Sequence, residues 1–145
     1  MNKSINSDFL NIMNERGFIH QITDQNKLDQ ELSTNTMTGY IGFDCTAPSL
    51  HVGSLIQIMM LRWFQKTGHK PIILMGGGTT KIGDPSGKDS ARPVLSSEDI
   101  EINQNNIRTI FEKFLKFGSG KNDAIIVDNS EWLERLNYVS FLRDF

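Results

Sequence analysis

Apolar and polar positions near the start of the chain predict two short helices and then a strand. Segment 7–17 has polar residues at its start, apolar residues at helical spacing and a closing glycine, as a capped helix does. A second helix is expected over 24–32, where Leu28 and Leu32 share one face. Residues 38–43 have the composition of a strand.

The middle of the chain predicts a helix and a strand that are both strongly apolar. Residues 50–66 are apolar almost all round, so we expect this helix to be buried and to end at Gly68. Residues 71–75 form a short apolar run that is typical of a buried parallel strand. They lead into residues 76–88, which predict a long glycine-rich loop.

The last third of the chain continues the same alternation of elements. Ser96 and Asp99 resemble a capping box, and the helix that follows is expected to stop at Gly118. Its apolar stripe consists of Ile107, Ile110, Phe111, Phe114 and Leu115. Residues 124–127 predict another buried strand and 138–145 a further helix. This order predicts parallel βαβ units in an α/β fold, and because three strands make half of a doubly wound sheet, we expect a fragment.

Composition narrows the class of protein. A chain of 145 residues with 38% hydrophobic residues and a net charge of −2 suits a globular domain, without a membrane span or a signal peptide. Cys45 has no disulfide partner in the chain, which favours a cytoplasmic location. The three histidines and one cysteine have no metal-ligand spacing, so we expect no protein-bound metal. The 15 basic residues are balanced by 17 acidic ones, which disfavours a basic patch for RNA.

The loop after the first predicted strand is one candidate site, because ligands of open α/β sheets bind beyond the carboxyl ends of strands. Thr46, His51 and Ser54 lie near the start of the following helix. Thr46 and His51 can donate hydrogen bonds to phosphate oxygens, and Gly53 leaves room for a flat base. The alternative is that His51 only caps the helix and Gly53 only allows close packing, which an isolated His-x-Gly would favour.

The glycine-rich loop after the second predicted strand is the other candidate site. Its glycines match neither the Walker A motif nor the dinucleotide-binding fingerprint. Thr79 and Asp84 can hold an ammonium group, while Lys88 and Arg92 can reach a polyphosphate. The alternative is a flexible surface loop with a β-turn over 84–87.

Taken together, the two loops resemble those of bacterial and organellar tyrosine–tRNA ligases (tyrosyl-tRNA synthetases). The resemblance covers about residues 14–144, and its anchors are segments 40–53, 68–71, 82–88, 129–132 and 141–144. It implies the first half of a doubly wound parallel nucleotide-binding sheet, which is Rossmann-like and of the HUP type. An N-terminal helical segment would span 1–35, and the first half of a class I aminoacyl-tRNA synthetase catalytic domain would span 36–145.

The resemblance also implies roles for individual residues. Those matching the tyrosine pocket are Tyr40, Asp44, Thr79, Asp84, Asn129 and Trp132. Those matching the ATP site are Gly42, Thr46, His51, Gly53 and Ser54, the last three within the HIGH-type motif. Those matching catalytic positions are Thr46, His51, Ser54, Lys88 and Arg92. Tyr40 would contact the substrate phenol, and Asp84 would bind the substrate ammonium group. Lys88 and Arg92, the two cations of the mobile loop, would bind the departing pyrophosphate.

The reaction implied is activation of tyrosine with Mg·ATP to tyrosyl-adenylate, followed by transfer to tRNA(Tyr), with Mg²⁺ entering with its substrate. The full-length family is expected to be dimeric and not membrane-bound. Its second half, its KMSKS loop and its tRNA-binding domain would lie beyond Phe145, so we expect the isolated chain to be inactive in aminoacylation. Ile41, Cys45 and Ser54 depart from the family pattern, in which a small polar residue, a proline and a His or Asn are usual.

Three alternatives stand beside this interpretation. A tryptophan–tRNA ligase fragment would not be expected to combine Tyr40 with the loop at 83–88. Other nucleotidyltransferases share the helix start but lack the second loop at this spacing. A folded remnant without catalytic function would fail to bind an adenylate analogue.

Overall fold

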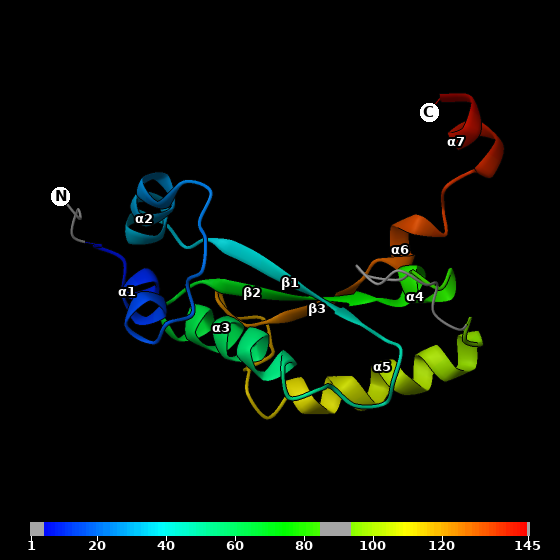
Figure 1. The fold of residues 1–145 in the computed structure, drawn as a ribbon, viewed down its shortest axis with the longest axis horizontal. Coiled ribbons are helices and arrows are strands. Elements are labelled where there is room, and N and C mark those ends of the chain that lie inside the picture. Colours follow the sequence, from blue (N-terminus) through cyan, green and yellow to red (C-terminus); the bar gives the residue numbers. More distant parts are fainter. Residues whose placement is uncertain (1–4, 85–93, 145) are drawn as a thin grey trace. The chain divides into compact units, whose positions relative to one another are not determined.

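The computed structural model describes residues 5–84 and 94–144, and these form an α/β structure (Figure 1). The elements in chain order are α1 (Asp8–Glu15), α2 (Gln25–Thr34), β1 (Thr38–Asp44), α3 (Ser54–Lys66), β2 (Lys70–Gly76), α4 (Gly77–Lys81), α5 (Ser97–Phe111), β3 (Ile125–Asp128), α6 (Ser130–Leu133) and α7 (Tyr138–Asp144). The strands form a three-stranded parallel sheet in the order β1-β2-β3. The predicted fold class, half of a Rossmann-like sheet after short N-terminal helices, is confirmed.

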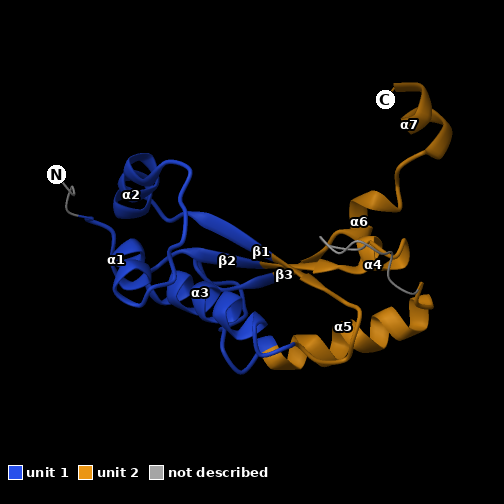
Figure 2. Cartoon of the chain, in the orientation of Figure 1, with its two compact units in different colours: residues 1–41, 51–72, 111–125 blue, residues 42–50, 73–110, 126–145 orange. Residues whose placement is uncertain are grey.

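The chain divides into two compact units (Figure 2). Unit 1 consists of residues 1–41, 51–72 and 111–125, and unit 2 of residues 42–50, 73–110 and 126–145. The predicted division of the sequence at residue 35 stays a prediction. Over the residues described, no helix combines the length and apolarity that a membrane crossing needs.

Polar side chains cap three of the predicted helix starts. The Ser7 hydroxyl accepts a hydrogen bond from the Leu10 N–H at 3.4 Å, and Asp24 Oδ1 accepts one from the Lys27 N–H at 3.0 Å. Ser96 Oγ accepts a bond from the Asp99 N–H at 3.1 Å and lies 2.6 Å from an Asp99 carboxylate oxygen. These bonds satisfy N–H groups that have no partner within the helix, which explains why the three helices begin where they do.

Three helices enclose the core of unit 1. Leu10 of α1, Leu32 of α2 and Phe64 of α3 are buried together. The Phe9 ring meets the Phe64 ring edge-on at 5.1 Å between centroids. Buried His69 packs against Phe64 and accepts a hydrogen bond at Nδ1 from the Met37 N–H. Burial lowers the pKa of His69, so its neutral form serves as a packing and accepting group.

A buried carboxylate makes the stability of unit 1 depend on pH. Asp29 accepts hydrogen bonds from the Ser7 N–H at 2.8 Å and the Asn6 N–H at 3.0 and 3.1 Å, and these bonds lower its pKa from 3.8. Its contribution is therefore complete above its unfolded-state pKa and is lost as the pH falls through the lower folded-state value. We expect the melting temperature to fall between pH 5 and pH 2.5 more steeply in the wild type than in Asp29→Asn. Parallel curves from circular dichroism would contradict this.

Four expectations about the elements are wrong in detail. Helix α3 begins at Ser54 and not at residue 50, and its buried side chains are Ile58, Leu61 and Phe64, while Leu55 and Ile56 are exposed. Helix α5 ends at Phe111 and not at Gly118, and a turn follows in which the Phe114 and Leu115 N–H groups donate to the Phe111 carbonyl. The first part of the predicted glycine-rich loop forms the short helix α4. Residues 85–88 of the predicted loop lie outside the described part. The strand predicted over 124–127 is β3 (Ile125–Asp128), whose residues are half-buried and not fully buried.

Candidate functional site

Helix α4 begins directly at the end of β2, and side chains from the end of β3 cap it. Asp128 Oδ1 accepts a hydrogen bond from the Gly77 N–H at 3.1 Å, and Asn129 Oδ1 accepts one from the Gly78 N–H at 2.8 Å. Glycine is a poor helix former, so these two bonds account for a helical turn where glycines alone would predict a loop. The residues that follow in α4 thereby acquire fixed positions.

The capped helix brings three of the predicted tyrosine-pocket residues together. Asn129 Nδ2 donates to Thr79 Oγ1 at 3.1 Å, and Thr79 Oγ1 donates to the Gly76 carbonyl at 3.1 Å. The Asp84 N–H donates to the Thr79 carbonyl at 3.1 Å. The Thr79 hydroxyl has one proton and two lone pairs, so these bonds leave it one lone pair and no proton. It can therefore accept a hydrogen bond from a donor such as an ammonium group.

The loop after β1 is fixed to two other elements of unit 2. The Cys45 N–H donates to Thr80 Oγ1 at 3.2 Å, and Asn103 Nδ2 of α5 donates to the Cys45 carbonyl at 2.9 Å. The Cys45 side chain is fully buried, and burial raises the pKa of its thiol to about 11. Cys45 is thus an unreactive packing residue. The hydrogen bonds to its N–H and carbonyl hold the backbone between Asp44 and Thr46 in place.

The start of α3 places His51 as a hydrogen-bond donor. Its Nδ1 accepts a bond from the Gly53 N–H at 3.0 Å, and the Ser54 N–H donates to the His51 carbonyl at 2.8 Å. A neutral imidazole whose Nδ1 accepts carries its proton on Nε2, so Nε2–H is the group available to a ligand. His51 is exposed. Its bond to the Gly53 N–H lies just before the first residue of α3, and the exposed ring also presents a donor.

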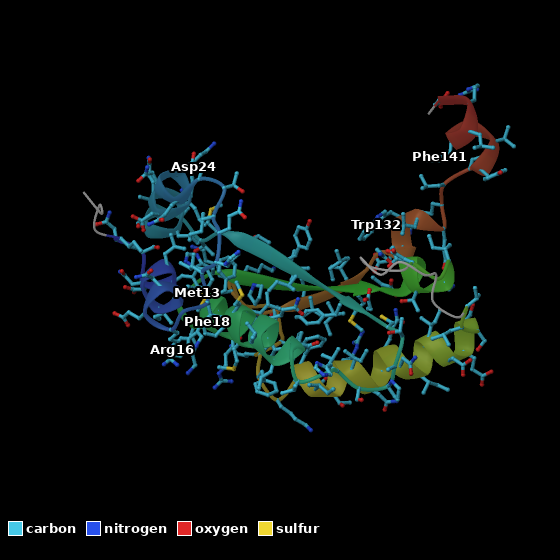
Figure 3. All side chains as sticks on the ribbon, viewed as in Figure 1. Met13, Arg16, Phe18, Asp24, Trp132 and Phe141 are labelled. Atoms are coloured by element: carbon cyan, nitrogen blue, oxygen red, sulfur yellow. The ribbon has the colours of Figure 1, made fainter. Side chains whose placement is uncertain are left out.

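The other predicted site residues lie at exposed positions or outside the described part. Tyr40 and Gly42 occupy exposed positions of β1, and a Cβ on Gly42 would meet no described heavy atom within 4 Å. Trp132 projects from α6 and is 45% exposed (Figure 3). Lys88 and Arg92 are outside the described residues.

Three residues with structural connections to the site escaped the sequence-based prediction. Asp128, Asn103 and Gln104 tie the ends of the strands to α5. The sequence signal for Asp128 is an aspartate after an apolar run. Asn103 and Gln104 are two of many polar residues in α5. Such signals occur in many surface segments and single out no position.

Comparison with known families decides where the chain belongs. A sequence model described as tRNA synthetases class I (W and Y) matches residues 32–145, which is most of the chain. The chain belongs to this family. The description of that model names both tryptophan and tyrosine enzymes.

Several curated members of the family are similar to the chain over almost its whole length. It is 62% identical over 138 residues to the tyrosine–tRNA ligase of Beijerinckia indica, 61% to that of Nitrobacter winogradskyi and 58% over 139 residues to that of Rhodospirillum rubrum. These matches cover 95% or 96% of the chain and 33% of each relative. The chain thus spans about a third of the length of the curated relatives it matches.

Solved structures of class I synthetases share the fold. A truncated mitochondrial tyrosyl-tRNA synthetase of Aspergillus nidulans superimposes with a TM-score of 0.77 at 27% identity, covering 94% of this chain and 41% of that one. The corresponding Coccidioides posadasii structure gives 0.70 at 28% identity, covering 93% and 39%.

Proposed function

We propose that this chain supplies the first part of the active site of a tyrosine–tRNA ligase. In that reaction the tyrosine carboxylate attacks the α-phosphate of Mg·ATP, the bond to the β-phosphate breaks, and tyrosyl-adenylate and pyrophosphate form. A hydroxyl group of the terminal ribose of tRNA(Tyr) then attacks the tyrosyl carbonyl, and AMP leaves. No protein nucleophile takes part, so the protein acts by positioning its substrates and by electrostatic stabilisation.

The observation that carries this proposal is the 62% identity over 95% of the chain with a protein named tyrosine–tRNA ligase. The family as a whole also includes tryptophan enzymes. The similar relatives quoted above are all named for tyrosine, which favours that substrate.

On the tyrosine side, the acceptor geometry of α4 supports binding of the substrate ammonium group. Thr79 Oγ1 has a lone pair left for it, and Asn129 fixes the Thr79 hydroxyl in place. Asp84 supplies the negative charge, and its backbone is tied to Thr79. Tyr40 meets the phenol, with Asp44 and Trp132 completing the pocket lining.

On the ATP side, hydrogen-bond donors at the start of α3 support binding of the triphosphate. His51 Nε2–H donates to a phosphate oxygen as charge develops in the transition state, and Thr46 and Ser54 supply hydroxyl donors. Gly42 and Gly53 leave room for the nucleotide. Lys88 and Arg92 hold the departing pyrophosphate. Mg²⁺ enters with ATP.

For the complete protein we propose a homodimer in the cytoplasm. Exposed apolar side chains at the C-terminal end of the described part support self-association, namely Leu136, Tyr138, Val139 and Leu142. We keep the division into a helical segment over 1–35 and a catalytic segment over 36–145 as part of this proposal.

A chimera tests the proposed function. Residues 1–145 replace the matching N-terminal third of the Beijerinckia indica tyrosine–tRNA ligase, and ATP–pyrophosphate exchange is measured with tyrosine. We expect tyrosine-dependent exchange within tenfold of the unmodified relative. A folded chimera without exchange would overturn the proposal.

Substituting Gly42 separates ligand binding from folding. Because a Cβ at this position meets no described atom within 4 Å, Gly42→Ala should leave the melting temperature of the 145-residue chain unchanged or slightly higher. In the chimera the added methyl group occupies nucleotide space and should raise the KM for ATP, since a misfit of one methyl costs about 1–3 kcal/mol in a fitted site. An unchanged KM would remove Gly42 from the ATP site.

A further inference from the structure

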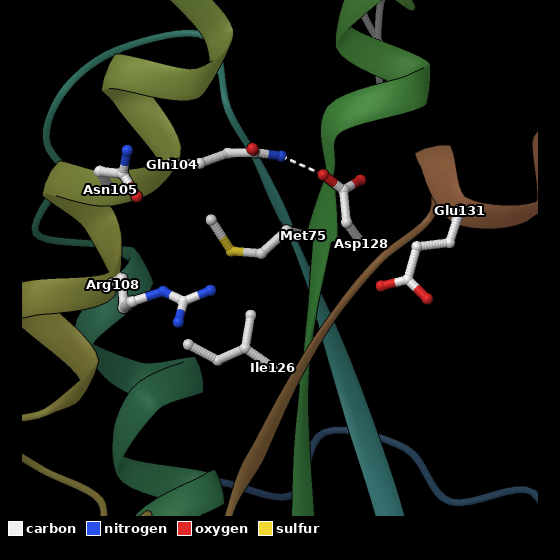
Figure 4. Close-up of a pocket in the computed structure, with 7 residues that line it drawn as sticks. All are labelled: Met75, Gln104, Asn105, Arg108, Ile126, Asp128 and Glu131. Carbon is white, nitrogen blue, oxygen red and sulfur yellow. Dashed lines mark hydrogen bonds between the residues drawn. The ribbon is translucent and has the colours of Figure 1, made fainter. Parts of the chain in front are cut away.

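The carboxylate of Asp128 has three hydrogen-bond donors around it, all within unit 2. Oδ1 accepts from the Gly77 N–H at 3.1 Å and from the Ser130 N–H at 2.9 Å. Oδ2 accepts from the side-chain amide of Gln104 on α5 (Figure 4). One side chain at the end of β3 thereby joins the first turn of α4, the first turn of α6 and the middle of α5.

This junction adjoins the residues assigned to the substrate ammonium group. Asn129 follows Asp128 directly, and its side chain holds Gly78 through Oδ1 and Thr79 through Nδ2. A Cβ on Gly77 would collide with both Asp128 carboxylate oxygens and with the Gln104 amide, so the backbone there approaches the carboxylate as closely as glycine permits. The orientation of Thr79 therefore depends on the turn that Asp128 fixes.

We propose that Asp128 is a positioning residue for tyrosine binding: it docks the 128–130 turn on α4 and so aims the Thr79 hydroxyl at the substrate ammonium group. This inference rests on the proposed function. Asp128 itself touches no substrate. It acts on tyrosine binding through Asn129 and Thr79. The ATP-side donor His51 is oriented separately, by its bond from the Gly53 N–H.

The surroundings of Asp128 allow variants that fold. It borders a cavity of about 110 Å³, whose lining is Met75, Gln104, Asn105, Arg108, Ile126, Asp128 and Glu131. Truncation to alanine thus enlarges an existing cavity and removes no apolar packing. Asp128→Asn keeps Oδ1 for Gly77 and Ser130, and the Gln104 amide can turn to accept from the new NH₂ group, so all three contacts survive.

The test compares Asp128→Ala, Asp128→Asn and a matched control. In the 145-residue chain, amide hydrogen exchange of Gly77 and Ser130 should accelerate roughly tenfold in Asp128→Ala, the factor that one hydrogen bond represents. In the chimera, Asp128→Ala should raise the KM for tyrosine about tenfold or more, with the KM for ATP within twofold of wild type. Asp128→Asn should stay within threefold of wild type in both measurements.

Asp123→Ala is the matched control, because Asp123 is a buried aspartate of unit 1 that accepts from a glycine N–H at 2.8 Å. It should lower the melting temperature and leave the tyrosine KM unchanged. An active wild-type chimera whose Asp128→Ala variant keeps its tyrosine KM, or loses tyrosine and ATP affinity equally, would overturn the positioning role alone. A wild-type chimera without exchange would instead overturn the proposed function on which this inference rests.

Discussion

His51→Ala is expected to lower the kcat of tyrosyl-adenylate formation in the chimera by about 10²- to 10³-fold, the usual loss when one transition-state donor is removed. In the proposed site, the His51 Nε2–H donates to a phosphate oxygen whose charge grows as the α-phosphate is attacked. The bond is therefore stronger in the transition state than in the bound substrate, and the KM for ATP should change little. Single-turnover pyrophosphate release measures the chemical step directly.

His20→Ala provides the control, since His20 is another exposed histidine of unit 1 that has no assigned role. It should match the wild type in both parameters. His51 also accepts a bond from the Gly53 N–H at the start of α3, so the melting temperature of His51→Ala must be compared with that of wild type. A KM increase with unchanged kcat would assign His51 to ground-state binding, and unchanged kinetics would remove it from the site.

Phe111→Ala is expected to lower the free energy of unfolding the most, by about 3–5 kcal/mol, because it removes a fully buried ring and leaves a cavity in the core. Domains of this size are stable by about 5–15 kcal/mol, so the substitution would remove a large share of the free energy of unfolding. Urea denaturation of the 145-residue chain, followed by circular dichroism, gives the difference.

The matched substitution is Phe141→Ala. It deletes the same ring from α7, where the side chain is 47% exposed (Figure 3). It should cost less than about 1 kcal/mol, since substitutions at exposed positions seldom cost more. Equal losses for the two substitutions would contradict the assignment of Phe111 to the core.

Local signals in the sequence were sufficient to predict most elements. The caps at Ser7, Asp24 and Ser96 mark helix starts, because each side chain satisfies an N–H group within three residues of it. The apolar run at 71–75 corresponds to β2, whose buried positions include Ile73 and Met75. In these cases the determining contacts are local or depend on simple periodicity.

The sequence failed where a distant side chain decides the local conformation. Glycines at 76–78 predict a loop, and Asp128 and Asn129 convert the segment into a helix from about fifty positions away. Similarly, the apolar residues of 50–66 indicate a helix buried all round, yet in the structure Leu55 and Ile56 are exposed. Periodicity identifies apolar positions, but neighbouring elements determine which of them are covered.

The candidate site divides in the same way. His51, Thr79 and Asp84 are candidates from the two loops of the sequence and from the family resemblance, and their binding roles stay predictions. What they present to a ligand needed the structure: the Nε2 proton of His51 follows from the Gly53 contact, and the acceptor state of Thr79 from Asn129 and Gly76.

The central claim is that the chain supplies the tyrosine-selecting part of a ligase active site, with Tyr40 at the phenol and Thr79 and Asp84 at the ammonium group. The most direct test is ATP–pyrophosphate exchange by the chimera with tyrosine, phenylalanine and tryptophan in parallel, together with the variant Tyr40→Phe. We predict exchange with tyrosine, rates near background with the other two amino acids, and weaker preference for tyrosine over phenylalanine in the variant. Equal exchange with all three amino acids, or faster exchange with tryptophan, would contradict the account.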